Sequence, residues 1–266
     1  MIDSHCHFDF PEFSKLHDAV WSHCHKLGVH NIIIPVVRPD KVDVAVKLSQ
    51  SKVGIYYAVG LHPWFVADFS VDHGDAYLSV LKTLICRSAD DKKCIAIGEA
   101  GLDALVDCPL SMQLEVLALQ LQLAQRLELP IILHQRKAYP QLLKLLKKYP
   151  LSKGGVVHAF SGSLQQAQEL WALGFYLGVG GVITYARAKK TRAAIAAMPL
   201  ASLVLETDAP DMPLEGMQGQ ANSPVNLPLI AAELALIKGV DIAEVKAQTL
   251  LNTQRLFSRI QDCDDE

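Results

Sequence analysis

Four histidines and two carboxylates of this sequence follow short apolar segments, and these residue types are ones that bind divalent metal ions. His5 and His7 end the first such segment, and Glu99 follows Ile95-Ala96-Ile97. The remaining members of the set are His134, His158 and Asp208. Neutral imidazoles suit Zn, Mn, Fe and Ni, whereas carboxylates suit Mg and Mn and can bridge two ions. Six ligands are too many for one catalytic ion with an open position, so the set predicts two ions.

Two ions about 3.5–4 Å apart lower the pKa of bound water and clamp a phosphoryl or carbonyl oxygen, which is the chemistry of metal-assisted hydrolysis. Each residue also has a simpler interpretation. The HxH pair, His134 and His158 are each compatible with an ordinary residue of the core or rim, and Glu99 with a buried ion pair. The metal site is favoured because all of them stand at the same end of their own predicted strands.

Short β-branched or apolar segments alternate with longer helical patterns, which is typical of a parallel sheet. Eight segments are predicted as strands: 1–7, 31–37, 55–60, 94–99, 130–134, 155–158, 175–178 and 203–206. The predicted helices are 12–27, 40–50, 73–87, 110–128, 138–148, 163–172, 188–197, 225–238 and 241–257. This alternation predicts an α/β fold, a single (β/α)₈ TIM barrel over residues 1–260, followed by a short acidic tail at 261–266.

An open, doubly wound sheet is the alternative fold, but its Gly-rich fingerprint would stand where His5-Cys6-His7 follows the first strand. Active sites of TIM barrels lie at the C-terminal ends of the strands, where the six candidate ligands are predicted. Alternation along a strand points His5 and His7 to one place and Cys6 away from it. The longest irregular segment, about 207–224, follows the last strand, and its length indicates a function.

Four further residues of this face are candidate substrate contacts. His62, within Gly60-Leu61-His62-Pro63-Trp64, either binds a phosphate or packs beside the tryptophan. Gly180 and Gly181 either let backbone N–H groups approach an anion or make a tight turn. Arg136 either makes a bidentate contact with a phosphate or is an ordinary surface arginine.

The composition limits the classes of partner. The 25 Lys and Arg residues against 28 Asp and Glu residues give a net charge of −3, so no strong basic field holds nucleic acid non-specifically. Six cysteines without a CxxC pair, and an N-terminus without signal-peptide character, predict free thiols and a cytoplasmic location. No segment approaches about 18 uninterrupted apolar residues. We therefore expect no membrane span, no obligate protein partner and a monomer.

Six motifs together resemble the TatD family of metal-dependent hydrolases, within the amidohydrolase-like barrels, and the similarity runs from Ile2 to about Phe257. They are Ile2-Asp3-Ser4-His5-Cys6-His7, Gly98-Glu99-Ala100-Gly101-Leu102-Asp103, Leu129-Pro130-Ile131-Ile132-Leu133-His134-Gln135-Arg136, His158-Ala159-Phe160-Ser161-Gly162, Leu205-Glu206-Thr207-Asp208-Ala209-Pro210 and Asn252-Thr253-Gln254-Arg255-Leu256-Phe257. Segments such as Phe8-Asp9-Phe10-Pro11 resemble one branch of that family.

The resemblance implies a deoxyribonuclease or phosphodiesterase, in some members a 3′–5′ exonuclease, with DNA as substrate and two divalent ions whose identity is open among Zn, Mn, Mg, Fe and Ni. It implies that His5, His7, Glu99, His134, His158 and Asp208 are the metal ligands and that Glu99 bridges the ions. Glu99 and Asp208 are the candidate catalytic residues, with Asp208 as general base. Asp103 and Glu206 are candidate partners that fix imidazole tautomers.

Two rival functions stay open at this point. The same metals would serve an amidohydrolase, lactonase or esterase acting on a small molecule, although Trp64, Phe65, Tyr185 and Arg187 suit nucleotides. A non-catalytic binding protein on an old enzyme scaffold is the second rival, and it predicts lost ligands. One departure concerns substrate contacts, because Ser223 stands where many relatives have a charged residue.

Overall fold

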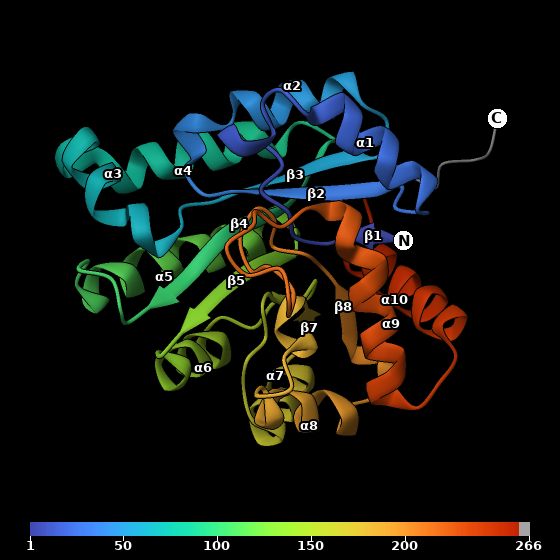
Figure 1. The fold of residues 1–266 in the computed structure, drawn as a ribbon. Helices are drawn as coiled ribbons and strands as arrows, with labels where there is room; N and C mark the ends of the chain where they lie inside the picture. Colours follow the sequence, from blue (N-terminus) through green and yellow to red (C-terminus); the bar gives the residue numbers. More distant parts are fainter. Residues whose placement is uncertain (261–266) are drawn as a thin grey trace.

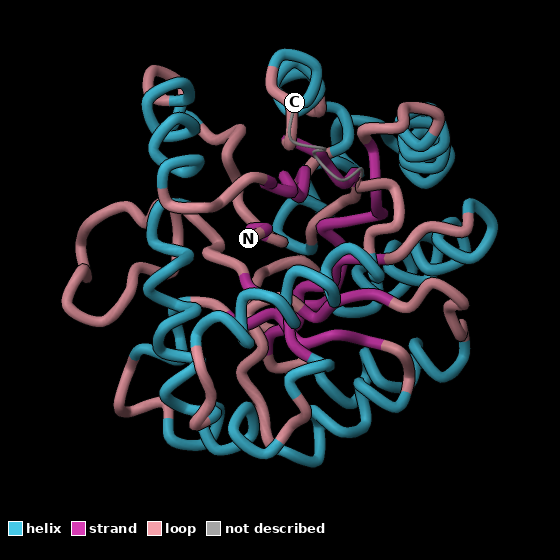
Figure 2. The backbone as a smooth tube through the Cα atoms, turned by 90° about the vertical axis from the view of Figure 1, so that its right-hand side faces the viewer, coloured by secondary structure: helices cyan, strands magenta, loops and turns pink. Residues whose placement is uncertain are grey.

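A computed structural model describes residues 1–260; residues 261–266, predicted as an acidic tail, lie outside the described residues. Eight parallel strands pair in chain order, and helices surround them (Figures 1 and 2). The strands are β1 (Ile2–Asp3), β2 (Asn31–Val36), β3 (Ile55–Val59), β4 (Cys94–Asp103), β5 (Ile131–Arg136), β6 (Gly155–Val157), β7 (Phe175–Val179) and β8 (Leu203–Leu205). The predicted (β/α)₈ barrel is confirmed, and the alternative of an open sheet is wrong.

Ten α-helices lie within residues 1–260, and short 3₁₀ turns connect several of them to the strands. They are α1 (His17–Lys26), α2 (Asp43–Ser51), α3 (Val66–His73), α4 (Tyr77–Ala89), α5 (Leu110–Leu127), α6 (Tyr139–Lys148), α7 (Leu164–Ala172), α8 (Lys189–Ala197), α9 (Leu227–Lys238) and α10 (Ile242–Leu256). Helix α3 was not predicted, because its eight residues offer only Val66 and Phe69 as a buried pair. None of the described helices is both long and apolar enough to cross a membrane.

Alternating side chains of the strands divide the core into two layers. Ile33 lies in one buried cluster with Ala58, while its neighbours Ile32 and Ile34 lie in the other, larger cluster. Residue alternation along a strand explains the division, since successive side chains face the barrel interior and the surrounding helices in turn. Phe257, just after α10, belongs to the interior cluster with Ile33. Apolar side chains therefore fill the barrel, and polar chemistry is confined to an end of it.

Strand β1 is much shorter than the predicted strand 1–7. Beyond Asp3 the chain still bonds to both of its neighbours, but not as a regular ladder. The backbone N of Ser4 donates to Leu205 O at 3.0 Å, and the backbone N of Cys6 donates to Ile33 O at 3.1 Å. The first bond joins the start of the barrel to β8 and closes it. The segment is therefore held on both sides while its backbone is free to depart from extended geometry.

Candidate metal centre

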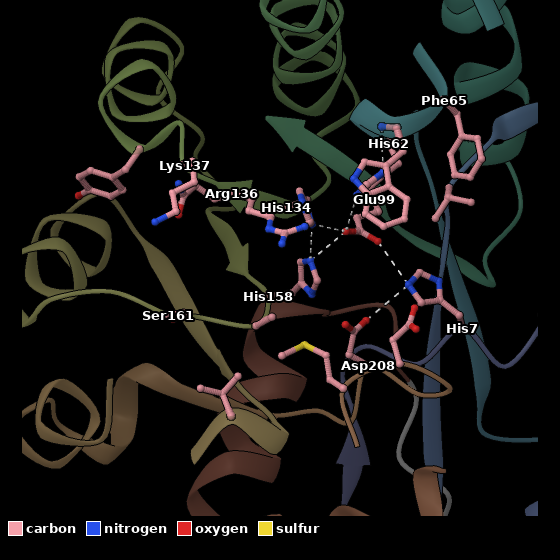
Figure 3. A pocket seen from close by; sticks show the side chains of 18 of the residues that line it. His7, His62, Phe65, Glu99, His134, Arg136, Lys137, His158, Ser161 and Asp208 are labelled. Atoms are coloured by element: carbon pink, nitrogen blue, oxygen red, sulfur yellow. Dashed lines mark hydrogen bonds and ion pairs between the residues drawn. The ribbon is translucent and has the colours of Figure 1, made fainter. Parts of the chain in front are cut away.

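The six candidate ligands converge at the C-terminal end of the barrel, around the carboxylate of Glu99 (Figure 3). A cavity of about 860 Å³ opens above them. Five of the six line this cavity: His7, Glu99, His134, His158 and Asp208. His5 lies beneath, with no exposed surface. Cys6 is buried in the larger apolar cluster, so His5 and His7 face the site and Cys6 faces away, as the alternation predicted.

One carboxylate oxygen of Glu99 faces the N-terminal histidines. Its Oε2 lies 3.3 Å from His5 Nε2 and 3.6 Å from His7 Nε2. Asp208 Oδ1 lies 3.3 Å and 3.5 Å from the same two nitrogens. We call His5, His7 and Asp208 the Oε2 cluster.

The other oxygen of Glu99 faces a second set of imidazoles. Its Oε1 lies 2.9 Å from His158 Nε2, 3.3 Å from His134 Nδ1 and 3.4 Å from His62 Nε2. His134 Nδ1 and His158 Nε2 are themselves 3.1 Å apart. We call these three histidines the Oε1 cluster. The two oxygens of one carboxylate thus serve two separate sets of donors.

The spacing of the donors fits metal ions. Ligands of a tetrahedral ion at about 2.0–2.1 Å lie about 3.4 Å from one another. The contacts of the Oε2 cluster, between 3.3 and 3.6 Å, match this spacing. Among the described residues the buried His5 Nε2 has no hydrogen-bond partner, so these contacts do not satisfy it. Such an orphaned nitrogen beside two carboxylates is what a cation would satisfy, and His5, His7 and Glu99 bring one ligand atom each within 4.8 Å of one another. On the other side, His134 and His158 could hold a cation together with Glu99.

Two glycines let β4 present Glu99 to both clusters. The pairing of β4 with β5 shifts register between Ile97 and Ala100. Gly98 has φ 135°, and a Cβ there would lie 2.6 Å from Ile132 O. A Cβ on Gly101, at φ 153°, would lie 2.0 Å from His134 O. The glycines of the Gly98–Asp103 motif are therefore required by backbone geometry rather than by contact with a ligand.

Asp208 stands in a turn that Asp3 holds in place. Its φ is 58°, a left-handed conformation that is uncommon for aspartate. Asp3 is fully buried and accepts hydrogen bonds from Thr207 N at 2.9 Å and Thr207 Oγ1 at 2.6 Å. It also accepts one from His5 N at 3.3 Å. One carboxylate thus ties the segment that carries His5 to the turn that carries Asp208.

Burial makes the ionised form of Asp3 less favourable. Desolvation outweighs the hydrogen bonds that the carboxylate accepts and raises its pKa to about 7. Sequence reasoning missed Asp3 as part of the site. The available signal was an acidic residue between apolar Ile2 and the HxH pair, within a segment predicted as a strand.

Asp103 contacts the Oε1 cluster as predicted for a partner that fixes a tautomer. Its Oδ2 lies 3.4 Å from His134 Nε2. When His134 is neutral, as a metal ligand must be, a proton on Nε2 would leave the lone pair of Nδ1 facing Glu99. Without a metal, burial lowers the pKa of His134, but Asp103 and Glu99 outweigh this and raise it to about 9, so a bound ion would have to displace a proton from Nδ1.

Glu206 plays a different part from the predicted one. Its Oε1 is 4.0 Å from His158 Nδ1, too far for a hydrogen bond, and accepts instead from the backbone N of Ala159. The contact holds the backbone next to His158 rather than its ring. Full burial raises the pKa of Glu206 to about 8. Gly178 accommodates the carboxylate, because a Cβ there would lie 2.2 Å from Glu206 Oε2.

His62 lies closer to the centre than either sequence interpretation required. It is 5% exposed, and its ring lies edge-on to that of Trp64 with centroids 5.6 Å apart. Its Nδ1 accepts from Trp64 N at 3.2 Å, so the proton of the neutral ring is on Nε2, facing Glu99. An N–H group is a donor and not a metal ligand.

The other predicted substrate contacts differ from one another. Arg136 is exposed and lines the cavity. Gly180 and Gly181 are not among the cavity's lining residues. A Cβ on Gly181 would lie 2.5 Å from Met212 O, which gives this glycine a packing reason. Their role toward an anion stays a prediction. Ser223 directly precedes a 3₁₀ turn (Pro224–Asn226), makes no side-chain hydrogen bond that caps it, and also lies outside the lining.

Comparisons with known proteins agree with this architecture. The family described as TatD related DNase matches residues 2–258. The chain belongs to this family. It is 43% identical over 258 residues to an uncharacterized metal-dependent hydrolase, YjjV, of Escherichia coli K12, with 97% of each chain covered. The crystal structure of YjjV, a TatD homolog, superposes with a TM-score of 0.89 at 42% identity, covering 97% of this chain and 98% of that one.

A more distant relative carries a more specific name. The protein of Klebsiella pneumoniae strain 342 named 3′–5′ ssDNA/RNA exonuclease TatD is 30% identical over 265 residues, with 97% of each chain covered. The resemblance predicted from the six motifs, including the branch, is thus confirmed.

Proposed function

We propose that this chain is a divalent-metal-dependent hydrolase that cleaves the phosphodiester bonds of DNA as a 3′–5′ exonuclease. The observation that carries the proposal is the carboxylate of Glu99, whose two oxygens face two separate sets of donors. A relative named 3′–5′ ssDNA/RNA exonuclease supports the choice of substrate and direction. The rival of a non-catalytic scaffold has less support, because none of the six candidate ligands has been lost.

In this proposal the chain holds two divalent ions. His5, His7 and Asp208 would hold one of them together with Glu99, and His134 and His158 would hold the other together with the same carboxylate. When bound, such ions acidify a water molecule and polarise a phosphoryl oxygen. Four imidazoles favour Zn, Mn, Fe or Ni, and Mg is the further candidate.

The chain's own residues supply the proton transfers and the positioning. Burial raises the pKa of Asp208, but the imidazoles of His5 and His7 outweigh this and hold it below its ordinary range. Asp208 is therefore deprotonated at neutral pH and accepts the proton of the attacking water. His62 Nε2–H donates toward Glu99 or a phosphate oxygen, and Arg136 binds phosphate at the rim.

We also propose that the barrel over residues 1–260 acts as a monomer in the cytoplasm. Support for the location comes from the cysteines, of which the five within residues 1–260 are free. Free thiols persist in a reducing compartment. Size-exclusion chromatography with light scattering and a fractionation of cells test the two statements.

The function is tested with single-stranded DNA labelled once at the 5′ end and once at the 3′ end. Wild type and Glu99→Gln are incubated side by side with Mg, Mn, Zn or EDTA. We expect degradation by wild type with added metal, none in the mutant or EDTA lanes, and a product ladder of 3′–5′ polarity. Equal lanes for wild type and mutant would overturn the nuclease proposal and favour a lactone, amide or small ester as substrate.

A further inference from the structure

Trp64 is an exposed aromatic side chain on the wall of the cavity. It is 54% exposed, whereas the other aromatic rings that line the cavity, Phe10, Phe65 and Tyr139, are partly buried. Within residues 1–260 it is also the one aromatic among the large apolar side chains that are exposed. More than half of this indole stays in water and contributes little to the hydrophobic core, so its position beside the candidate metal centre calls for another reason.

The indole is nevertheless held in one orientation. Trp64 Nε1 donates to Asp103 Oδ2 at 2.9 Å, and Asp103 itself is fully buried. The backbone of Asp103 is bound on both sides by Gln113, whose side chain accepts from its N and donates to its O, each at 2.9 Å. The same carboxylate faces His134 Nε2. A rigid partner thus fixes the indole relative to the Oε1 cluster, while leaving much of its surface open to the cavity.

Cationic side chains line the same cavity. They are the exposed Arg136, Lys137 and Lys190, and Figure 3 shows Arg136 and Lys137 beside His134. Arg136 on β5 pairs with Asp103, the residue that holds the indole, so a cation and the indole come from neighbouring strands. His62 contacts both: its ring centroid lies 5.6 Å from that of Trp64, and its Nε2 lies 3.4 Å from Glu99 Oε1. A nucleotide carries an anionic phosphate and a flat aromatic base on either side of a sugar. A nucleotide whose phosphate binds between the candidate metal centre and these cations would find an aromatic surface for its base in the same cavity.

We propose that Trp64 is the base-stacking platform of this cavity and makes the site prefer a nucleotide over a base-free phosphodiester. The inference rests on the proposed phosphodiesterase function and adds the group that recognises the base. Stacking on an aromatic side chain tolerates every base, because each has a π-face. Trp64 therefore selects nucleic acid without selecting sequence.

The test uses the dinucleotide dTpdT, which has one scissile phosphodiester bond, and its two analogues with an abasic sugar on the 5′ or the 3′ side. For wild type with its activating metal, we expect one abasic analogue to lose about tenfold in kcat/KM, the size of one stacking contact. Trp64→Ala should cleave dTpdT about tenfold more slowly and no longer discriminate. Trp64→Phe, which keeps a ring but loses the bond to Asp103, should lie between them.

A matched control and a second readout separate this inference from the proposed function. Trp171→Ala makes the same change on α7, outside the cavity lining, and should retain full discrimination. With the same metal present, deoxyadenosine 5′-phosphate, which has no phosphodiester bond to cleave, should quench more fluorescence in wild type than in Trp64→Phe. Cleavage of dTpdT with equal discrimination by wild type and Trp64→Ala, or equal quenching, overturns the platform and leaves the nuclease intact. Absence of any cleavage overturns the nuclease, and the quenching still decides the platform.

Discussion

The two sides of Glu99 hold their donors by different means. In the Oε2 cluster, Asp3 joins the backbone at His5 and Thr207. Of its candidate ligands, His7 and Asp208 line the cavity, while His5 is fully buried. In the Oε1 cluster, a side chain, Asp103, orients His134, whose side chain is 16% exposed. His62 adds a third imidazole on that side alone.

The difference shows how one carboxylate can serve two unlike sites. The hydrogen bonds of Asp3 lie in a dry core beside the fully buried His5, whereas the imidazole of His134 is partly exposed to solvent and is held less rigidly. We therefore expect an ion in the Oε2 cluster to be retained and an ion in the Oε1 cluster to exchange more readily with solution.

Removing the shared carboxylate should have the largest effect. Glu99→Gln takes the charge from both clusters at once, so we expect turnover to fall at least about 10³-fold. The number of bound ions per chain, measured by mass spectrometry after dialysis, should fall because both clusters lose a charged ligand. The circular dichroism spectrum should stay unchanged. Glu115→Gln, an exposed carboxylate on α5, is the control and should match wild type in both measurements. Near wild-type turnover in Glu99→Gln would remove it from the mechanism.

Breaking one cluster at a time should distinguish the two ions. Asp208→Asn and His158→Asn should each lower turnover by about 10²–10⁴-fold. Each should leave about one bound ion of the two we propose. Against a graded chelator, the ion left in Asp208→Asn should be released at a lower chelator concentration than the ion left in His158→Asn. Equal release from the two variants would contradict the proposed difference in rigidity.

The two supporting carboxylates should differ in their effect on stability. Asp3→Ala leaves three buried donors without an acceptor, so the free energy of unfolding should fall by about 2–4 kcal/mol. Asp103→Ala frees donors on Trp64, Leu105 and His134, whose side chain is partly exposed. Trp64 and Leu105 are 54% and 57% exposed, so water can replace the carboxylate there. We expect a loss of about 1 kcal/mol there.

Urea denaturation of metal-free protein measures both losses. Asp3→Asn retains an acceptor oxygen and should recover part of the loss, which keeps the test useful if Asp3→Ala does not fold. A larger loss for Asp103→Ala than for Asp3→Ala would reverse the comparison.

The smallest expected effect is the contribution of Glu206 to the pH dependence of the free energy of unfolding. Burial raises its folded-state pKa from an ordinary 4.5 to about 8. Between these values the unfolded chain has released the proton and the folded chain retains it, so the free energy of unfolding falls as pH rises from 4.5 toward 8 and levels off above. Glu206→Gln cannot ionise and still offers an acceptor to Ala159. In EDTA, its stability relative to wild type should improve by at least about 1 kcal/mol between pH 5 and pH 9.

The barrel could be predicted because each of its units carries a local signal. Apolar segments such as Ile32–Ile34 and Ile95–Ile97 alternate with helical patterns, and the parallel order follows from that alternation. Boundaries were less accurate where strands are irregular. Strand 1–7 was predicted too long because its apolar start continues into residues whose backbone turns away, and β4 was predicted too short because Gly98 and Gly101 interrupt its pattern.

The convergence of the six candidate ligands could be predicted, but the residues that support them could not. The C-terminal ends of barrel strands lie at one face of the barrel. The six candidate ligands follow five predicted strands, so they could be grouped from the sequence without any interatomic distance. The contact between Asp3 and Thr207 joins residues 204 positions apart, and no periodic pattern indicates it. The sequence also did not indicate that Asp103 contacts an imidazole whereas Glu206 accepts from a backbone N–H, since both were predicted only as carboxylates near histidines.

The sequence by itself determined the fold, the family and the set of donors that meet at the barrel mouth, because these depend on residue type and on spacing along the chain. Only the tertiary structure decided which oxygen of Glu99 faces which histidines, which nitrogen of His62 carries the proton, and that Asp103 holds Trp64 beside the centre. Those properties depend on angles and on distances of a few ångströms between elements remote in sequence. Such details are settled by packing, where many contacts act on one side chain at once.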